Sequence, residues 1–97
     1  KSQSLLLREL LVDALPTVTF AAPEASFLAW LDCRDLHLDQ DPAAFFLEHA
    51  RVGLNSGPTF GPSGAGFARL NFATSPEILT EVVARMGAAV LSVPTQA

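Results

Sequence analysis

The chain has 97 residues, a length that supports one hydrophobic core. Its net charge is −4 and its six basic residues are scattered, which excludes the basic surface that nucleic acids or anionic membranes attract. No apolar run approaches the ~20 residues that a membrane span needs. A single cysteine cannot form an internal disulfide, so we expect a cytoplasmic protein.

The first third of the chain predicts one helix and two strands. Leucines at helical spacing predict a helix over residues 4–15, which Pro16 ends. No capping residue is recognised at its start, so we expect residues 1–15 to be the end of a helix that joins two domains. A short strand is predicted over 18–20. A longer strand over 26–33 is apolar on both faces, which predicts a central place in a sheet.

The middle of the chain predicts a second helix and a long loop. An acidic loop over 35–41 ends at Asp41, which can cap a helix over 42–51 with Pro42 at its first position. Residues 52–54 predict a brief strand. Residues 55–66 are rich in Gly and Pro, and we expect a loop of the kind that is often functional.

The last third predicts a strand that carries an arginine and a final helix. The strand covers residues 67–73, and Thr74 and Ser75 can both cap the helix, with Glu77 placed as in a capping box. The order helix, strand, strand, helix, short strand, strand, helix favours an α+β fold. We expect one domain over residues 1–97, with a small three- to four-stranded sheet and helices mainly on one face.

Arg69 is the main candidate for a binding residue. Side chains alternate along a strand, so Arg69 and Asn71 share the face opposite to the apolar Leu70. A guanidinium group stays charged and matches a carboxylate two bonds at a time. The residues therefore allow capture of a small carboxylate by Arg69, with Asn71 as a candidate support. They equally allow a solvated edge strand, or a structural salt bridge from Arg69 to Asp32 or Glu24.

Other candidate sites are weak. The Gly/Pro loop lacks the order of a phosphate-binding motif, and a flexible turn is the better interpretation. Cys33 lies among aspartates that would raise the pKa of its thiol, which favours a buried structural cysteine. The spacing of His37 and His49 with the nearby aspartates matches no metal site, so we predict no metal.

Four segments together resemble the C-terminal small domain of the pyridoxal-phosphate (PLP) dependent aminotransferases of classes I and II, which have fold type I. The likeness is greatest to the cystathionine β-lyase or C–S lyase branch. It rests on residues 23–34, 46–50, 52–61 and 66–73, in order and with fitting spacing, and above all on Trp-Leu-Asp and Gly-x-x-Arg-Leu-Asn-Phe together.

The resemblance implies a large domain that holds PLP on a lysine and a small domain that closes over it. It implies that Arg69 binds the α-carboxylate of an amino-acid substrate, and that the loop 55–66 borders the active site. It further implies that the partners of this chain are the amino-acid substrate and the missing large domain, in a full-length enzyme that is a homodimer.

One departure limits what this chain could do alone. Its single lysine, Lys1, does not resemble the cofactor lysine of the family. We therefore expect no catalytic residue and no bound cofactor in this fragment, which would be inactive without the rest of the enzyme. The residues leave transamination and C–S bond cleavage open. They also leave open a self-standing α+β module that binds an amino acid without catalysis, and a purely structural interface domain.

Overall fold

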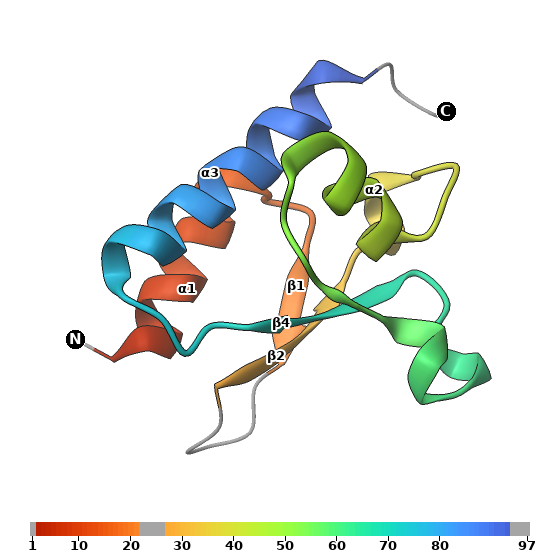
Figure 1. The fold of residues 1–97 in the computed structure, drawn as a ribbon, viewed down its shortest axis with the longest axis horizontal. Coiled ribbons are helices and arrows are strands. Elements are labelled where there is room, and N and C mark those ends of the chain that lie inside the picture. The colour runs from red at the N-terminus through yellow and green to blue at the C-terminus, as the bar shows by residue number, and fades with distance from the viewer. Residues whose placement is uncertain (1, 22–26, 94–97) are drawn as a thin grey trace.

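A computed structural model describes residues 2–21 and 27–93, which form an α+β fold (Figure 1). The described helices are α1 (Gln3–Ala14), α2 (Pro42–Ala50) and α3 (Pro76–Ser92), and the strands are β1 (Thr19–Ala21), β2 (Leu28–Asp32), β3 (Asn55–Ser56) and β4 (Phe67–Asn71). Single-turn 3₁₀ helices η1 (Arg34–Leu36), η2 (Gly57–Phe60) and η3 (Pro62–Gly64) lie in the connections. The predicted fold class is confirmed. Among the described helices, none has the length and apolar character to span a membrane.

The sheet is antiparallel throughout, with strand order β1-β2-β4-β3. The central pair, β2 and β4, aligns Trp30 with Arg69 and Leu31 with Ala68. One further backbone hydrogen bond continues the pairing at each end, from the Cys33 N–H to the Gly66 carbonyl and from the Phe72 N–H to the Phe27 carbonyl. The central place predicted for the second strand is therefore correct.

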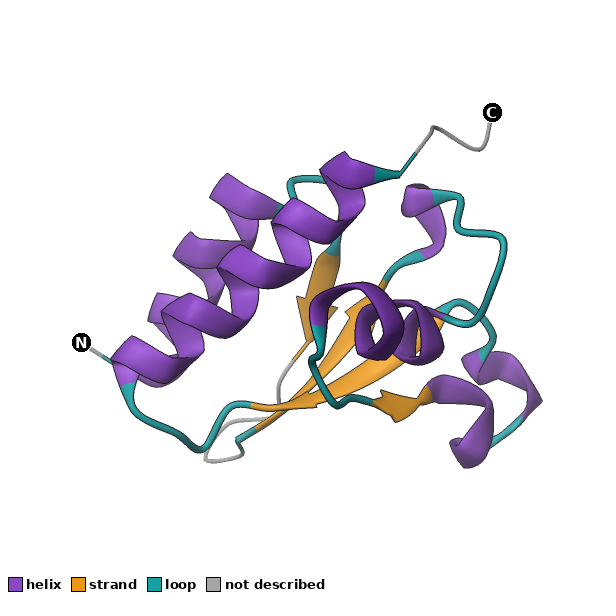
Figure 2. Cartoon of the chain, turned by 45° about the horizontal axis from the view of Figure 1, so that its top comes forward, coloured by secondary structure: helices purple, strands orange, loops and turns teal. Residues whose placement is uncertain are grey.

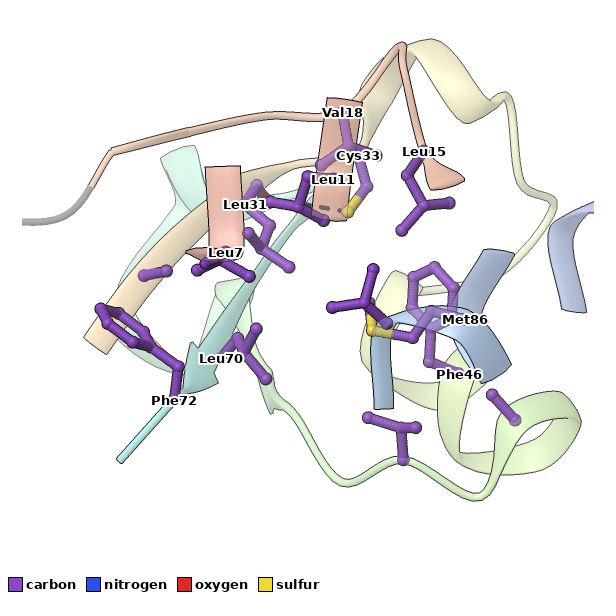
Figure 3. Close-up of a cluster of buried hydrophobic side chains, with 14 of the residues drawn as sticks. Leu7, Leu11, Leu15, Val18, Leu31, Cys33, Phe46, Leu70, Phe72 and Met86 are labelled. Carbon is purple, nitrogen blue, oxygen red and sulfur yellow. Dashed lines mark hydrogen bonds between the residues drawn. The ribbon is translucent and has the colours of Figure 1, made fainter. Parts of the chain in front are cut away.

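The three helices cover one face of the sheet (Figure 2). The core beneath them draws on every helix and on the two central strands, as Figure 3 shows for its largest side chains. The fully buried side chains include Leu7, Leu11, Leu31, Phe46 and Met86. Burial of such side chains supplies most of the stability of a domain this small. We call the opposite side, which none of the three described α-helices covers, the outer face of the sheet.

Three side chains fix where the helices begin. The hydroxyl of Ser2 accepts a hydrogen bond from the Leu5 N–H at 3.2 Å, so α1 does have a capping residue and the prediction of an uncapped start is wrong. Asp41 caps α2 as predicted. Of the two candidate caps for α3, it is Ser75 that accepts the Ile78 N–H.

The segment between α2 and β4 differs from its prediction. The short strand is β3, at residues 55–56, and not at 52–54. Residues 55–56 were predicted as part of the loop because two polar residues carry no periodic signal. The remainder is folded into η2 and η3, whose backbones touch: a Cβ on Gly57 would overlap the carbonyl oxygen of Gly64. Only glycine permits this approach, and it gives the loop 57–64 a defined shape.

Cys33 is part of the core and is 2% exposed. Burial above all, then the carboxylates of Asp32 and Asp41, raise the pKa of its thiol to about 12. The prediction of a buried structural cysteine is confirmed.

Replacement of a buried leucine on α1 should destabilise the chain far more than replacement of an exposed one. Leu7 is 0% exposed, and Leu5 on the same helix is 52% exposed. We expect Leu7→Ala to lower the free energy of unfolding by about 2–5 kcal/mol, and Leu5→Ala to lower it by less than about 1 kcal/mol. Urea unfolding of the 97-residue chain measures both, and equal losses would contradict the described packing of α1.

The native thiol should resist alkylation. Because the pKa of the buried thiol is raised to about 12, the thiolate is far scarcer at pH 8 in the native chain than in the unfolded one. We expect iodoacetamide at pH 8 to modify the urea-unfolded 97-residue chain rapidly and the native chain slowly, as read by mass spectrometry. Because the chain has a single cysteine, the readout is unambiguous. Equal rates in the two states would show that Cys33 is accessible.

Candidate functional site

Strand β4 presents two chemically different faces. Ala68 and Leu70 are buried on the helix side, whereas Phe67 and Arg69 are half-buried and Asn71 is exposed on the outer face. The predicted alternation is therefore confirmed. Since β4 lies between β2 and β3, it is not an edge strand, and that alternative for Arg69 is wrong.

Arg69 occupies the middle of the outer face. It is aligned with Trp30 on β2 and with Asn55 on β3, so three side chains form a row across three strands. The Nε and Nη2 groups of Arg69 both donate to the Oδ1 atom of Asn55, at 3.2 and 3.1 Å. The ring of Phe60, carried by η2, lies 4.6 Å from the guanidinium carbon. The guanidinium of Arg69 is thus hydrogen-bonded along one edge by Asn55 and lies over the ring of Phe60.

The aromatic residues around Arg69 form one cluster, which we call the aromatic cluster: Trp30, Phe60 and Phe67. Trp30 stacks on Phe67 with ring centroids 5.4 Å apart, and meets Phe60 edge-on at 5.9 Å. Arg34 lies over the other end of this cluster, 4.9 Å from the Phe67 ring. Apolar surroundings weaken solvent screening, so an anion beside Arg69 would be bound more tightly here than in open water.

Asp32, one of the two salt-bridge partners predicted for Arg69, pairs with a different arginine. Arg34 donates from Nε and Nη2 to the two carboxylate oxygens of Asp32, at 2.9 and 2.7 Å. These hydrogen bonds lower the pKa of Asp32. A salt bridge from Arg69 to Asp32 is therefore wrong, and Glu24 lies outside the described residues. Within residues 2–21 and 27–93, no carboxylate pairs with Arg69.

Asn71 lies two residues beyond Arg69 on the same face, and the structure gives it a local contact. Its Oδ1 atom accepts the Ala73 N–H at 2.9 Å, which turns the chain out of β4 towards α3. Its amide group is thus oriented by the backbone, and a role for it in binding stays a prediction. The described residues contain no cluster of three metal-ligating side chains, and the absence of a metal site stays a prediction.

Two residues of the site were missed in the sequence. Asn55 and Phe60 both fall within the segment predicted as irregular, and only the pairing of β3 with β4 and the turn of η2 bring them to Arg69. Asn55 lies fourteen positions from Arg69 in the chain. A contact across that separation leaves no periodic signal in either segment.

Known proteins include homologues of this chain, which are similar to it in sequence and in fold. No family model matches the chain. A candidate cystathionine β-lyase of Mycobacterium leprae is 43% identical over 100 residues, which cover 90% of this chain and 25% of that protein. The cystathionine β-lyase of Corynebacterium glutamicum is 40% identical over 68 residues, or 67% of this chain and 17% of that protein. The chain therefore spans about a quarter or less of the length of these relatives.

Solved structures agree with the sequence relatives. A candidate PLP-dependent β-cystathionase from Corynebacterium diphtheriae superposes with a TM-score of 0.83 at 42% identity, over 92% of this chain and 23% of that one. The PLP-bound C–S lyase from Staphylococcus hominis has a TM-score of 0.83 at 28% identity, over 93% and 24%. By sequence and by fold, this chain is a homologue of the cystathionine β-lyases and C–S lyases, and those relatives are PLP-dependent proteins of the aminotransferase fold.

Proposed function

We propose that this chain is the C-terminal small domain of a PLP-dependent aminotransferase or C–S lyase, and that Arg69 binds the α-carboxylate of its amino-acid substrate. The observation that most supports the proposal is the position of Arg69 and the contacts that it makes. It lies at the centre of the outer face, is held by Asn55 and Phe60, and pairs with no described carboxylate. A charged side chain organised in this way is suited to an anionic ligand.

The chemistry of the site suits the carboxylate of an amino acid. One guanidinium can form two parallel hydrogen bonds with a carboxylate, which fixes both the position and the orientation of the ligand. Orientation matters because PLP, held by the full-length protein, would supply the electron sink for bond cleavage at the substrate Cα. Arg69 would anchor the substrate by its carboxylate and so fix how the Cα is presented, and Asn71 stays a candidate support beside it.

The residues of this chain do not fit the cofactor by themselves. Residues 2–97 contain no lysine, and Lys1 lies outside the described residues. We therefore propose that another part of the full-length protein holds PLP, and that this domain alone is inactive. The homodimer belongs to the same proposal, and so does the role of α1, which Ser2 caps, as the end of a link between two domains.

The aromatic cluster completes what the chain contributes. Trp30, Phe60 and Phe67 would form an apolar wall beside the bound carboxylate. An apolar wall lowers the local dielectric and so strengthens the contact between Arg69 and the carboxylate. Whether the bound amino acid is then transaminated or cleaved depends on groups outside this chain.

Loss of Arg69 should impair substrate binding in the full-length protein. We expect Arg69→Ala to raise KM for the amino-acid substrate about a hundredfold or more, because two hydrogen bonds to a charged group disappear. Arg85→Ala on α3, away from the outer face, is the matched control and should leave KM unchanged. Steady-state kinetics with added PLP measure both variants.

Two outcomes would speak against the proposal. Wild-type kinetics in Arg69→Ala would show that the carboxylate is bound elsewhere. An amino acid that binds the full-length protein through Arg69, with no PLP absorbance and no turnover, would instead favour the non-catalytic binding module. The absorbance spectrum of the full-length protein with PLP separates these two results.

A further inference from the structure

The contact between Asn55 and Arg69 uses one particular edge of the guanidinium group. A guanidinium has two edges that can bind a carboxylate, one formed by Nε and Nη2 and one formed by Nη1 and Nη2. The Oδ1 atom of Asn55 accepts from both groups of the first edge, at 3.2 and 3.1 Å. The edge formed by Nη1 and Nη2 is left for a ligand.

Asn55 is itself held in place by neighbouring contacts. The antiparallel pairing of β3 with β4 aligns Asn55 with Arg69, and Ser56 beside it donates through its hydroxyl to Asp41 at 3.0 Å. Asp41 also caps α2 through its second carboxylate oxygen. The backbone at Asn55 is thus connected through Ser56 and Asp41 to the start of α2. This connection restricts the movement of Asn55 and lets it hold the long, flexible side chain of Arg69.

Phe60 restricts the same guanidinium in a second direction. Its ring lies 4.6 Å from the guanidinium carbon, and the contact of Gly57 with Gly64 shapes the turn that carries it. Asn55 therefore limits movement along the edge of the group, and Phe60 limits movement through its plane. An arginine that is ordered before the ligand arrives pays less conformational entropy on binding.

We propose that Asn55 is a positioning residue for Arg69. It occupies the Nε and Nη2 edge, so that the substrate α-carboxylate is received end-on, through Nη1 and Nη2. This inference rests on the proposed function of Arg69 and adds the residue that orients it. Asn55 does not touch the substrate in this account, and its effect passes through Arg69 alone.

The test compares an amino-acid substrate with its α-carboxamide, which lacks the negative charge, in the full-length protein with PLP. The readout is the ratio of the two KM or dissociation constants. We expect Arg69→Ala to abolish the preference for the carboxylate. We expect Asn55→Ala to raise KM for the amino acid about three- to tenfold, with kcat and the binding of the carboxamide little changed.

A double-variant comparison separates positioning from general destabilisation. If Asn55 acts through Arg69, then Asn55→Ala added to Arg69→Ala should cause no further change in the ratio. Gln40→Ala is the control, because it removes an exposed amide that donates to Glu48, away from Arg69. Asn55→Ser serves in the same comparison if Asn55→Ala does not fold.

The results distinguish this inference from the proposed function. An unchanged ratio in Arg69→Ala overturns both. A changed ratio in Arg69→Ala with an unchanged ratio in Asn55→Ala overturns the positioning role alone. Tighter binding of the amino acid to Asn55→Ala also overturns it, because Asn55 would then compete with the carboxylate for Arg69.

Discussion

Strand β4 is paired on both of its edges, with β2 along five residues and with β3 along two. This pairing allows no rotation of the strand, so Ala68 and Leu70 must enter the core while Phe67 and Arg69 face the other way. A register shift of one residue would bury the guanidinium and expose the core. The apolar packing beneath the helices therefore also determines where the charge of Arg69 stands.

The outer face gains its character from the asymmetry of the fold. All three helices lie on one side, and the other side carries aromatic rings with two arginines above them. Arg34 is neutralised by Asp32, whereas the contacts of Arg69 with other described side chains are to an amide and a ring. The two arginines are residues of the same type, but they differ in what they can bind because their partners differ.

Local signals explain why much of this fold is predictable from the sequence. Each signal can be recognised within a few neighbouring residues. The signals are the apolar periodicity of α1 and α3, the Asp41-Pro42 start of α2 and the alternation of β4. The face on which Arg69 lies follows from the same alternation. The cap of α1 was missed, although Ser2 is a usual capping residue, because too little chain precedes it to show a pattern.

The partners of Arg69 could not be predicted in this way. Asn55 reaches it through a two-residue strand, and Phe60 through a turn that depends on the contact of two glycines. Both are tertiary contacts, and no spacing in the sequence encodes them. The contacts that hold Arg69 are visible in the structure, whereas Arg69 itself is a candidate on the sequence alone.

The claim that links fold to function is that the outer face receives an α-carboxylate at Arg69. A crystal structure of the full-length protein with PLP and an unreactive amino-acid analogue tests it most directly. The account predicts carboxylate oxygens about 3 Å from Nη1 and Nη2 of Arg69, with Asn55 still bonded to Nε. A carboxylate bound by other residues, with Arg69 contacting only Asn55 and Phe60, would contradict it.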